Sequence, residues 1–319
     1  MVTPAVGIFL PTMSERSGAP GDVAAAARHA EDLGFESVWA VDQLMAGTGV
    51  PVLDSGIALA AAAAVTSRVG LAYGVLVVAL HPLAWLAKQV ASLQHVSEGR
   101  LILGVGTGGD RHSESWAAAG VSRRDRGRRT DHFLQVLPEL LAGQPARLEE
   151  SPDGSVAALA PSAALPPVIV GGMSGPALRR AARYGDGWFP LPAPLPVVTE
   201  ARARLEELAA QYGRPAPPVT ASLMTAVVGD PDLPGPDELT RRLTDPDGMF
   251  GIPVGQVPAV LHSGPPSEIA ARLAEHFSRG VERVVISVAA GNWFRQAELA
   301  AEARNLLDSP ASAHPPGDR

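Results

Sequence analysis

The stretch RLILGVGTGG, residues 100–109, contains the pattern on which the whole chain is built. Residues 101–105 are almost all apolar, as expected of a strand buried on both faces, and a glycine-rich loop follows directly. Glycine has no Cβ and adopts positive φ, so such a loop lets backbone N–H groups approach a ligand closely. A second junction of this kind, PPVIVGGMSGP at residues 166–176, leads into a helix. Two junctions together predict a phosphate held from two sides.

Outward from this stretch, segments typical of buried strands alternate with amphipathic helices. The expected strands are residues 6–10, 37–41, 69–78, 101–105, 168–170, 187–189, 219–228 and 284–288. The main expected helices are residues 23–33, 54–65, 83–96, 125–141, 176–184, 197–212, 267–279 and 296–307. This alternation predicts an α/β protein with a closed (β/α)8 barrel, whose functional loops follow the strands. A doubly wound open sheet is the alternative.

Two stretches interrupt the alternation. Residues 144–167 are rich in Pro, Ser and Ala and are expected to be irregular surface chain. Residues 230–264, after the seventh strand, are rich in Pro, Gly and Asp and are expected to be an inserted irregular segment with one short helix near 237–243. With no other break in composition, residues 1–308 are expected to form one domain, and residues 309–319 a disordered tail.

The composition narrows the function. The chain has 319 residues, 46% hydrophobic and 18% charged, so it can bury a large core. Its formal net charge of −7 argues against a general nucleic-acid binder. No apolar run has the length of a membrane span, and no signal peptide is indicated, so a cytoplasmic protein is expected. The absence of cysteine excludes disulfides and thiolate sites, and no His/Asp/Glu set has metal-ligand spacing.

Several blocks carry a resemblance to a known family. They are GFESVWAVDQ (34–43), RVGLAYGVLVVALHPLAWLAKQVASLQHVSEGRLILGVGTGG (68–109), RGRRTDHF (126–133), PPVIVGG (166–172) with RAARYGDGWFP (180–190), and GPPSEIAARLAEHFSRGVERVVI (264–286). In this order the set resembles the bacterial-luciferase-like superfamily over most of the chain. The resemblance implies a (β/α)8 barrel that uses FMN or the deazaflavin coenzyme F420.

The resemblance also implies positions for the cofactor. It places around the phosphate Gly106, Thr107, Gly108, Gly171, Gly172, Ser174 and Gly175. Backbone N–H groups and the start of the following helix would supply the field there. Arginines within residues 123–129 would add positive charge for the several carboxylates of an F420 tail. Behind the ring, the resemblance implies a bulge with a non-proline cis peptide at Gly74-Val75.

Two departures from the family pattern concern the chemistry. Many members end the second strand with Asp-His, and that histidine acts as acid or base, whereas this chain has Asp42-Gln43. Glutamine exchanges no proton near neutral pH. Asp42 is therefore expected either to contact the cofactor or substrate or to cap a loop, and His112 is the expected replacement proton carrier. His81 is expected mainly to fix the start of the next helix. Gly109 stands where the sugar-phosphate dehydrogenases of the family carry Glu, which argues against glucose-6-phosphate as substrate.

The expected function is hydride transfer between F420 and a small organic substrate with a C=C or C=N bond. The alternatives are an FMN-dependent monooxygenase, which needs a dry site, and a non-catalytic cofactor-binding subunit. Loops at residues 14–21, 44–52 and 230–264 are expected to determine specificity. Apolar candidates for the site are Phe9, Trp39, Leu76, Trp188, Phe189, Met249 and Phe250. A homodimer is also an expectation.

Overall fold

The strands close into a barrel in the computed structural model, which describes residues 5–16, 18–47, 49–108, 113–148, 156–190 and 193–308. Eight parallel strands form it: β1 (Ala5–Phe9), β2 (Ser37–Ala40), β3 (Gly70–Tyr73), β5 (Leu101–Gly106), β8 (Val168–Gly171), β9 (Gly187–Phe189), β10 (Val219–Val227) and β12 (Val281–Val288). β12 pairs with both β1 and β10, and Val219 of β10 pairs with Trp188 of β9, which closes the ring. The open-sheet alternative is thereby excluded.

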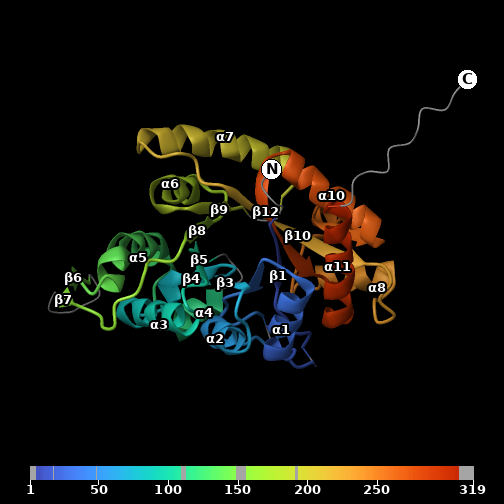
Figure 1. The fold of residues 1–319 in the computed structure, drawn as a ribbon, viewed down its shortest axis with the longest axis horizontal. Coiled ribbons are helices and arrows are strands. Elements are labelled where there is room, and N and C mark those ends of the chain that lie inside the picture. Colours follow the sequence, from blue (N-terminus) through green and yellow to red (C-terminus); the bar gives the residue numbers. More distant parts are fainter. Residues whose placement is uncertain are drawn as a thin grey trace, which may run out of the picture.

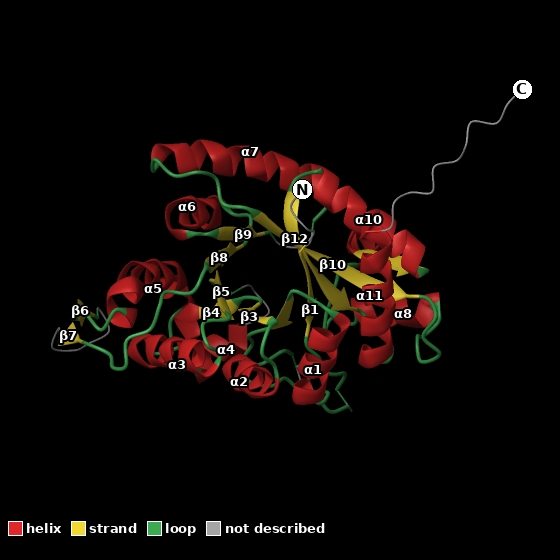
Figure 2. Ribbon diagram, in the orientation of Figure 1, coloured by secondary structure: helices red, strands yellow, loops and turns green. Residues whose placement is uncertain are grey.

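Helices surround the barrel (Figures 1 and 2). They are α1 (Val23–Leu33), α2 (Ser55–Val65), α3 (Leu83–Val96), α4 (Ser113–Ala118), α5 (Arg126–Leu141), α6 (Gly175–Tyr184), α7 (Leu195–Gln211), α8 (Pro236–Thr244), α9 (Val257–Val260), α10 (Pro266–Ser278) and α11 (Trp293–Asp308). Short acidic side chains cap the starts of two of them: Asp54 accepts from the Ile57 N–H at 2.8 Å, and Asp22 from the Ala25 N–H at 3.0 Å. None of the described helices is both long and apolar enough to cross a membrane.

Three sequence predictions need correction. The expected third strand is split into β3 and β4 (Leu76–Val77), followed by a 3₁₀ turn, Val78–Leu80. The segment after β10, expected to be irregular apart from one short helix, holds α8, a 3₁₀ turn (Val254–Gln256), α9 and the strand β11 (Leu261–Gly264), which pairs with β10. The stretch expected to be irregular surface chain includes the antiparallel pair β6 (Ala146–Arg147) and β7 (Val156–Ala157). Another 3₁₀ turn, Arg123–Asp125, precedes α5.

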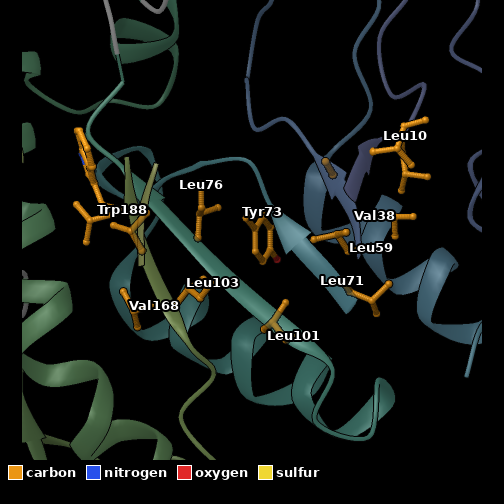
Figure 3. Packing of buried hydrophobic residues seen from close by; sticks show 14 of the residues in the cluster. Leu10, Val38, Leu59, Leu71, Tyr73, Leu76, Leu101, Leu103, Val168 and Trp188 are labelled. Atoms are coloured by element: carbon orange, nitrogen blue, oxygen red, sulfur yellow. The ribbon is translucent and has the colours of Figure 1, made fainter. Parts of the chain in front are cut away.

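Two apolar layers hold the barrel together. The larger lies between strands and helices, where Leu71, Tyr73, Leu101 and Leu103 are buried (Figure 3). The smaller fills the barrel and includes three aromatic side chains. The Trp39 ring lies 6.2 Å from that of Phe9 and 5.3 Å from that of Phe189. Such pairs contribute about 0.5–1.5 kcal/mol each beyond burial, so the interior supports the strand ends rigidly.

One surface differs from the rest. The exposed face of α2 consists of Ile57, Ala60, Ala61 and Ala64, and no residue of this helix is charged. Trp85 on the neighbouring helix α3 is 70% exposed, and Ile57 is 72% exposed. Large apolar side chains gathered on one face are typical of interaction surfaces.

Candidate functional site

The break in the third strand lies at Gly74-Val75, whose peptide bond is cis, as the family resemblance implies. Gly74 faces the aromatic side chains in the barrel. A Cβ built on Gly74 would lie 2.6 Å from Cε1 of Phe9 and 3.0 Å from Cε3 of Trp39. Only a residue without a side chain fits at this point, so the bulge rests directly on the aromatic core.

The Val75 side chain packs directly against three glycines of the neighbouring strands. A Cβ on Gly106 would come within 2.5 Å of Val75 Cγ2, and one on Gly171 within 3.0 Å. At Gly104 a Cβ would lie 3.0 Å from Val75 Cγ1 and would overlap the Tyr73 carbonyl oxygen. Gly106 and Gly171 therefore have a packing role that the sequence did not reveal, because the contact joins residues far apart in the chain. Their role toward a cofactor stays a prediction.

Gly172 and Gly108 adopt the backbone conformation that favours glycine, with φ of 105° and 71°. The Gly172 N–H donates to the Phe189 carbonyl at 2.9 Å, and its own carbonyl accepts from the Trp188 indole at 2.8 Å. Because its N–H has a partner, Gly172 shapes the turn into α6 and has no free N–H for a phosphate. Trp188, like Leu76, is buried in the apolar layer between strands and helices. A side chain in this layer does not line a substrate site, so the prediction for these two residues is wrong.

The start of α6 offers the donors that Gly172 lacks. Ser174 is the N-cap, and its hydroxyl accepts from the Ala177 N–H at 3.4 Å. Gly175 begins the helix, where backbone N–H groups have no helical partner and the helix dipole favours an anion. The exposed Arg179 guanidinium reaches back over this end, since a Cβ on Gly175 would lie 3.6 Å from Arg179 Nη1. This group of residues suits a phosphate.

The expected arginine cluster is divided among several roles. Arg128 pairs with Asp125 at 3.7 Å. Arg129 donates to the carbonyls of Ala79 and His81, both at 3.0 Å, and so ties α5 to the loop after β4. Arg124 is exposed and has no ion pair among the described residues. The cluster is thus partly structural, and only a fraction of its charge remains for a ligand.

Asp42 is buried where β2 ends, and protein groups occupy both of its oxygens. The Ser55 hydroxyl donates to Oδ1 and the Val77 N–H to Oδ2, each at 2.8 Å. His81 Nε2 lies 3.4 Å from Oδ2. Burial raises the pKa of Asp42, but His81 and the hydrogen bonds from Val77 and Ser55 lower it further, so the pKa lies below its ordinary value. Asp42 is therefore an anion at neutral pH.

His81, expected mainly to fix the start of α3, also contacts Asp42, which the sequence did not reveal. It is 39 positions from Asp42 in the chain, and the only local signal was its place before Pro82. Gln43, which follows Asp42, has a buried Oε1 without a hydrogen-bond partner. The expected proton carrier, His112, and the neighbouring Gly109 lie outside the described residues.

Two further polar atoms near this end of the barrel are buried and unpartnered, Ser115 Oγ and Trp116 Nε1. Trp116 packs against Val77 and Ala79, and Val77 pairs with Gly106 in the strand register. A buried polar group without a partner costs roughly 1–3 kcal/mol, and a polar ligand would satisfy it. The residues present therefore fit a phosphate-bearing cofactor at this end of the barrel.

The three loops expected to determine specificity meet one another. Arg16 lies 3.4 Å from Asp247, and Arg242 lies 2.7 Å from Glu15. A Cβ on Gly47 would lie 3.3 Å from the Asp247 carbonyl oxygen. The loops after β1, β2 and β10 thus form one surface where the strands end, and Phe250 packs below it in a cluster with Met224 and Leu243.

This geometry can be compared with known proteins. The model of the family described as luciferase-like monooxygenase matches residues 5–233. The chain belongs to this family. An uncharacterized protein of Mycobacterium tuberculosis is 35% identical to this luciferase-like chain over 143 residues, which are 44% of this chain and 49% of that protein. Limonene 1,2-monooxygenase of Rhodococcus erythropolis is 27% identical over 193 residues, 58% of this chain and 49% of that enzyme. The chain thus spans about half the length of these relatives.

Solved structures share the luciferase-like barrel at low identity. An F420-dependent secondary alcohol dehydrogenase in complex with an F420–acetone adduct superposes with a TM-score of 0.79 at 16% identity, covering 96% of this chain and 99% of that one. The oxygenating constituent of 3,6-diketocamphane monooxygenase from Pseudomonas putida, in complex with FMN, gives 0.70 at 16% identity, covering 95% and 96%. At such identities the likeness establishes the fold.

Proposed function

We propose that this luciferase-like oxidoreductase transfers a hydride between coenzyme F420 and a small organic substrate, reducing a C=C or C=N bond. The observation that carries the proposal is the arrangement around Val75. This side chain rests on glycines of β5 and β8, while the start of α6 with Arg179 lies at the same end of the barrel. A flat ring could be supported at Val75 while its phosphate binds at Gly175.

When bound, reduced F420 supplies a hydride from its deazaflavin ring. Thr107, Gly108, Gly175 and Arg179 would hold its phosphate, and the exposed Arg124 would face the carboxylates beyond it. FMN has no such carboxylates, so the exposed Arg124, which has no ion pair among the described residues, favours F420. The likeness to an F420-dependent dehydrogenase supports this choice at the level of the fold.

Titration of the purified protein with F420 and, separately, FMN tests the proposal. We expect micromolar binding of F420 and much weaker binding of FMN. Arg179→Gln should weaken F420 binding several-fold, because a charge-assisted contact to phosphate is lost. Arg183→Gln on the same helix is the matched control, since Arg183 packs over the Tyr184 and Tyr212 rings. Binding of FMN in preference to F420 would overturn the proposal.

The second candidate is an FMN-dependent monooxygenase. The family description and the similarity to limonene 1,2-monooxygenase favour it. The loop surface linked by Arg16 and Arg242 would help to keep water from a reactive intermediate. Oxygen consumption with reduced FMN and candidate substrates distinguishes this function from hydride transfer.

A further inference from the structure

Reduction of a C=C or C=N bond adds a hydride at one atom and a proton at the other, so the site needs a proton donor. Gln43 cannot serve, because its amide does not ionise near neutral pH. Asp42 cannot serve either, since its pKa is lowered and both oxygens are occupied. Another titratable side chain is therefore sought among the described residues, which do not include the expected proton carrier His112.

His81 is a titratable group held beside Asp42 where β2 ends. Its ring is fixed by Asp42, because Nε2 lies 3.4 Å from the buried Oδ2. A carboxylate that holds one ring nitrogen sets the orientation and tautomer of an imidazole and leaves the other nitrogen for chemistry. The side chain is 27% exposed and no partner for Nδ1 is found among the described residues. Nδ1 is therefore the nitrogen able to meet a substrate.

The backbone of His81 is held as firmly as its ring. Its N–H donates to the Val78 carbonyl at 3.1 Å, and its carbonyl accepts from Arg129 Nη2 at 3.0 Å. Four positions earlier, Val77 donates to Asp42 and pairs with Gly106. These contacts fix His81 relative to the ends of the strands that carry the glycines under Val75. Its position therefore does not depend on a mobile loop.

We propose that His81 is the catalytic acid of this site, with Asp42 as its positioning residue. This inference rests on the proposed function. The hydride adds to one atom of the C=C or C=N bond, and the π electrons move to the other atom. That atom takes the proton from Nδ1 of the protonated His81, and the neutral imidazole regains a proton from water. In the described part of the chain, the charged groups that contact His81 are Asp42 from β2, at the ring, and Arg129 from α5, at the backbone carbonyl.

The first test follows the ring itself, without cofactor. NMR of ¹³C,¹⁵N-histidine protein should show neutral His81 with its proton on Nε2, and Asp42→Asn should change this tautomer preference, since the carboxylate that faces Nε2 is removed. An unchanged His81 tautomer in Asp42→Asn would overturn the assigned pairing. This measurement does not depend on which cofactor the protein uses.

The second test uses the protein loaded with F420. His81→Ala should retain F420 binding but lose kcat by about 100-fold or more, the usual contribution of a general acid. Added imidazole should restore part of the rate, and the acid–base limb of the pH–rate profile should disappear. His95→Gln is the control, because His95 lies on α3 and contacts the Ser162 carbonyl instead. An unchanged kcat and pH profile in His81→Ala overturns the proposal, whereas failure of the wild type to bind F420 overturns the proposed function.

Discussion

Substitution of Gly106 by Ala tests the packing on which the site rests. The new methyl would lie 2.5 Å from Val75 Cγ2, about an ångström closer than an ordinary contact. The backbone of Gly106 is not in the left-handed region, so alanine is tolerated there conformationally. Any loss of stability must therefore come from the overlap with Val75.

The expected cost is that of overpacking, about 1–3 kcal/mol. Val75→Ala removes the overlapping atom, and the remaining Val75 Cβ lies at an ordinary 3.7 Å from the new methyl. Gly106→Ala should therefore cost almost nothing in the Val75→Ala background. In a double-mutant cycle the two substitutions should show a favourable coupling of about 1–3 kcal/mol.

Urea and thermal unfolding of the wild type, both single variants and the double variant measure this coupling. The unfolding entropy is about 2.1 cal/mol/K per residue. For a chain of 319 residues, a loss of 1 kcal/mol in the free energy of unfolding therefore lowers Tm by about 1.5 °C. Gly255→Ala is the control, because no atom lies within 4 Å of a Cβ at that position. Equal destabilisation by Gly106→Ala in both backgrounds would refute the contact with Val75.

Three further predictions follow from other parts of the structure. Because folding lowers the pKa of Asp42, its stabilisation is complete above about pH 4 and is lost as the pH falls through the folded value. Asp42→Asn should therefore flatten the fall in stability below about pH 4, measured by urea unfolding. Arg16→Ala breaks the exposed pair with Asp247, so it should change stability by less than about 1 kcal/mol, but raise KM in steady-state assays; an unchanged KM would remove this loop from the substrate site. We propose a homodimer through the exposed apolar side chains of α2 and α3, so Ile57→Glu and Trp85→Glu should give monomers in light scattering, and equal masses for all three proteins would contradict this.

Much of the fold was predictable because its signals are local. The bounds predicted for α1 and α3 agree with the structure, since apolar periodicity and the neighbouring caps decide them. The split after Tyr73 was not visible in the strand pattern, because residues 69–78 are apolar nearly throughout. β11 was missed because its sequence, LHSG, has little strand propensity. It forms through pairing with β10, a partner distant in sequence.

The geometry of the site was predictable only where the interacting residues are neighbours in the sequence. α6 begins at Gly175, one residue before the predicted start, and Ser174 is its N-cap, because a capping residue and its helix are neighbours in sequence. The roles of Gly106 and Gly171 depend on Val75, which reaches them from another strand. The tie between Asp42 and His81 likewise depends on the closed barrel and on the turn after β4. Long-range contacts of this kind leave no local pattern.

The contacts of Asp42 explain how the site keeps its geometry although Gln43, at the end of β2, is no proton donor. Asp42 does not depend on its neighbour Gln43, since its oxygens are held by Ser55, Val77 and His81. The carboxylate is therefore a fixed point where the ends of β2 and β4 meet the start of α2. A titratable ring placed on either side of it would be oriented by the same charge. In this chain the ring comes from the turn after β4, which is why we propose Asp42 as the anchor of the site and His81 as its acid.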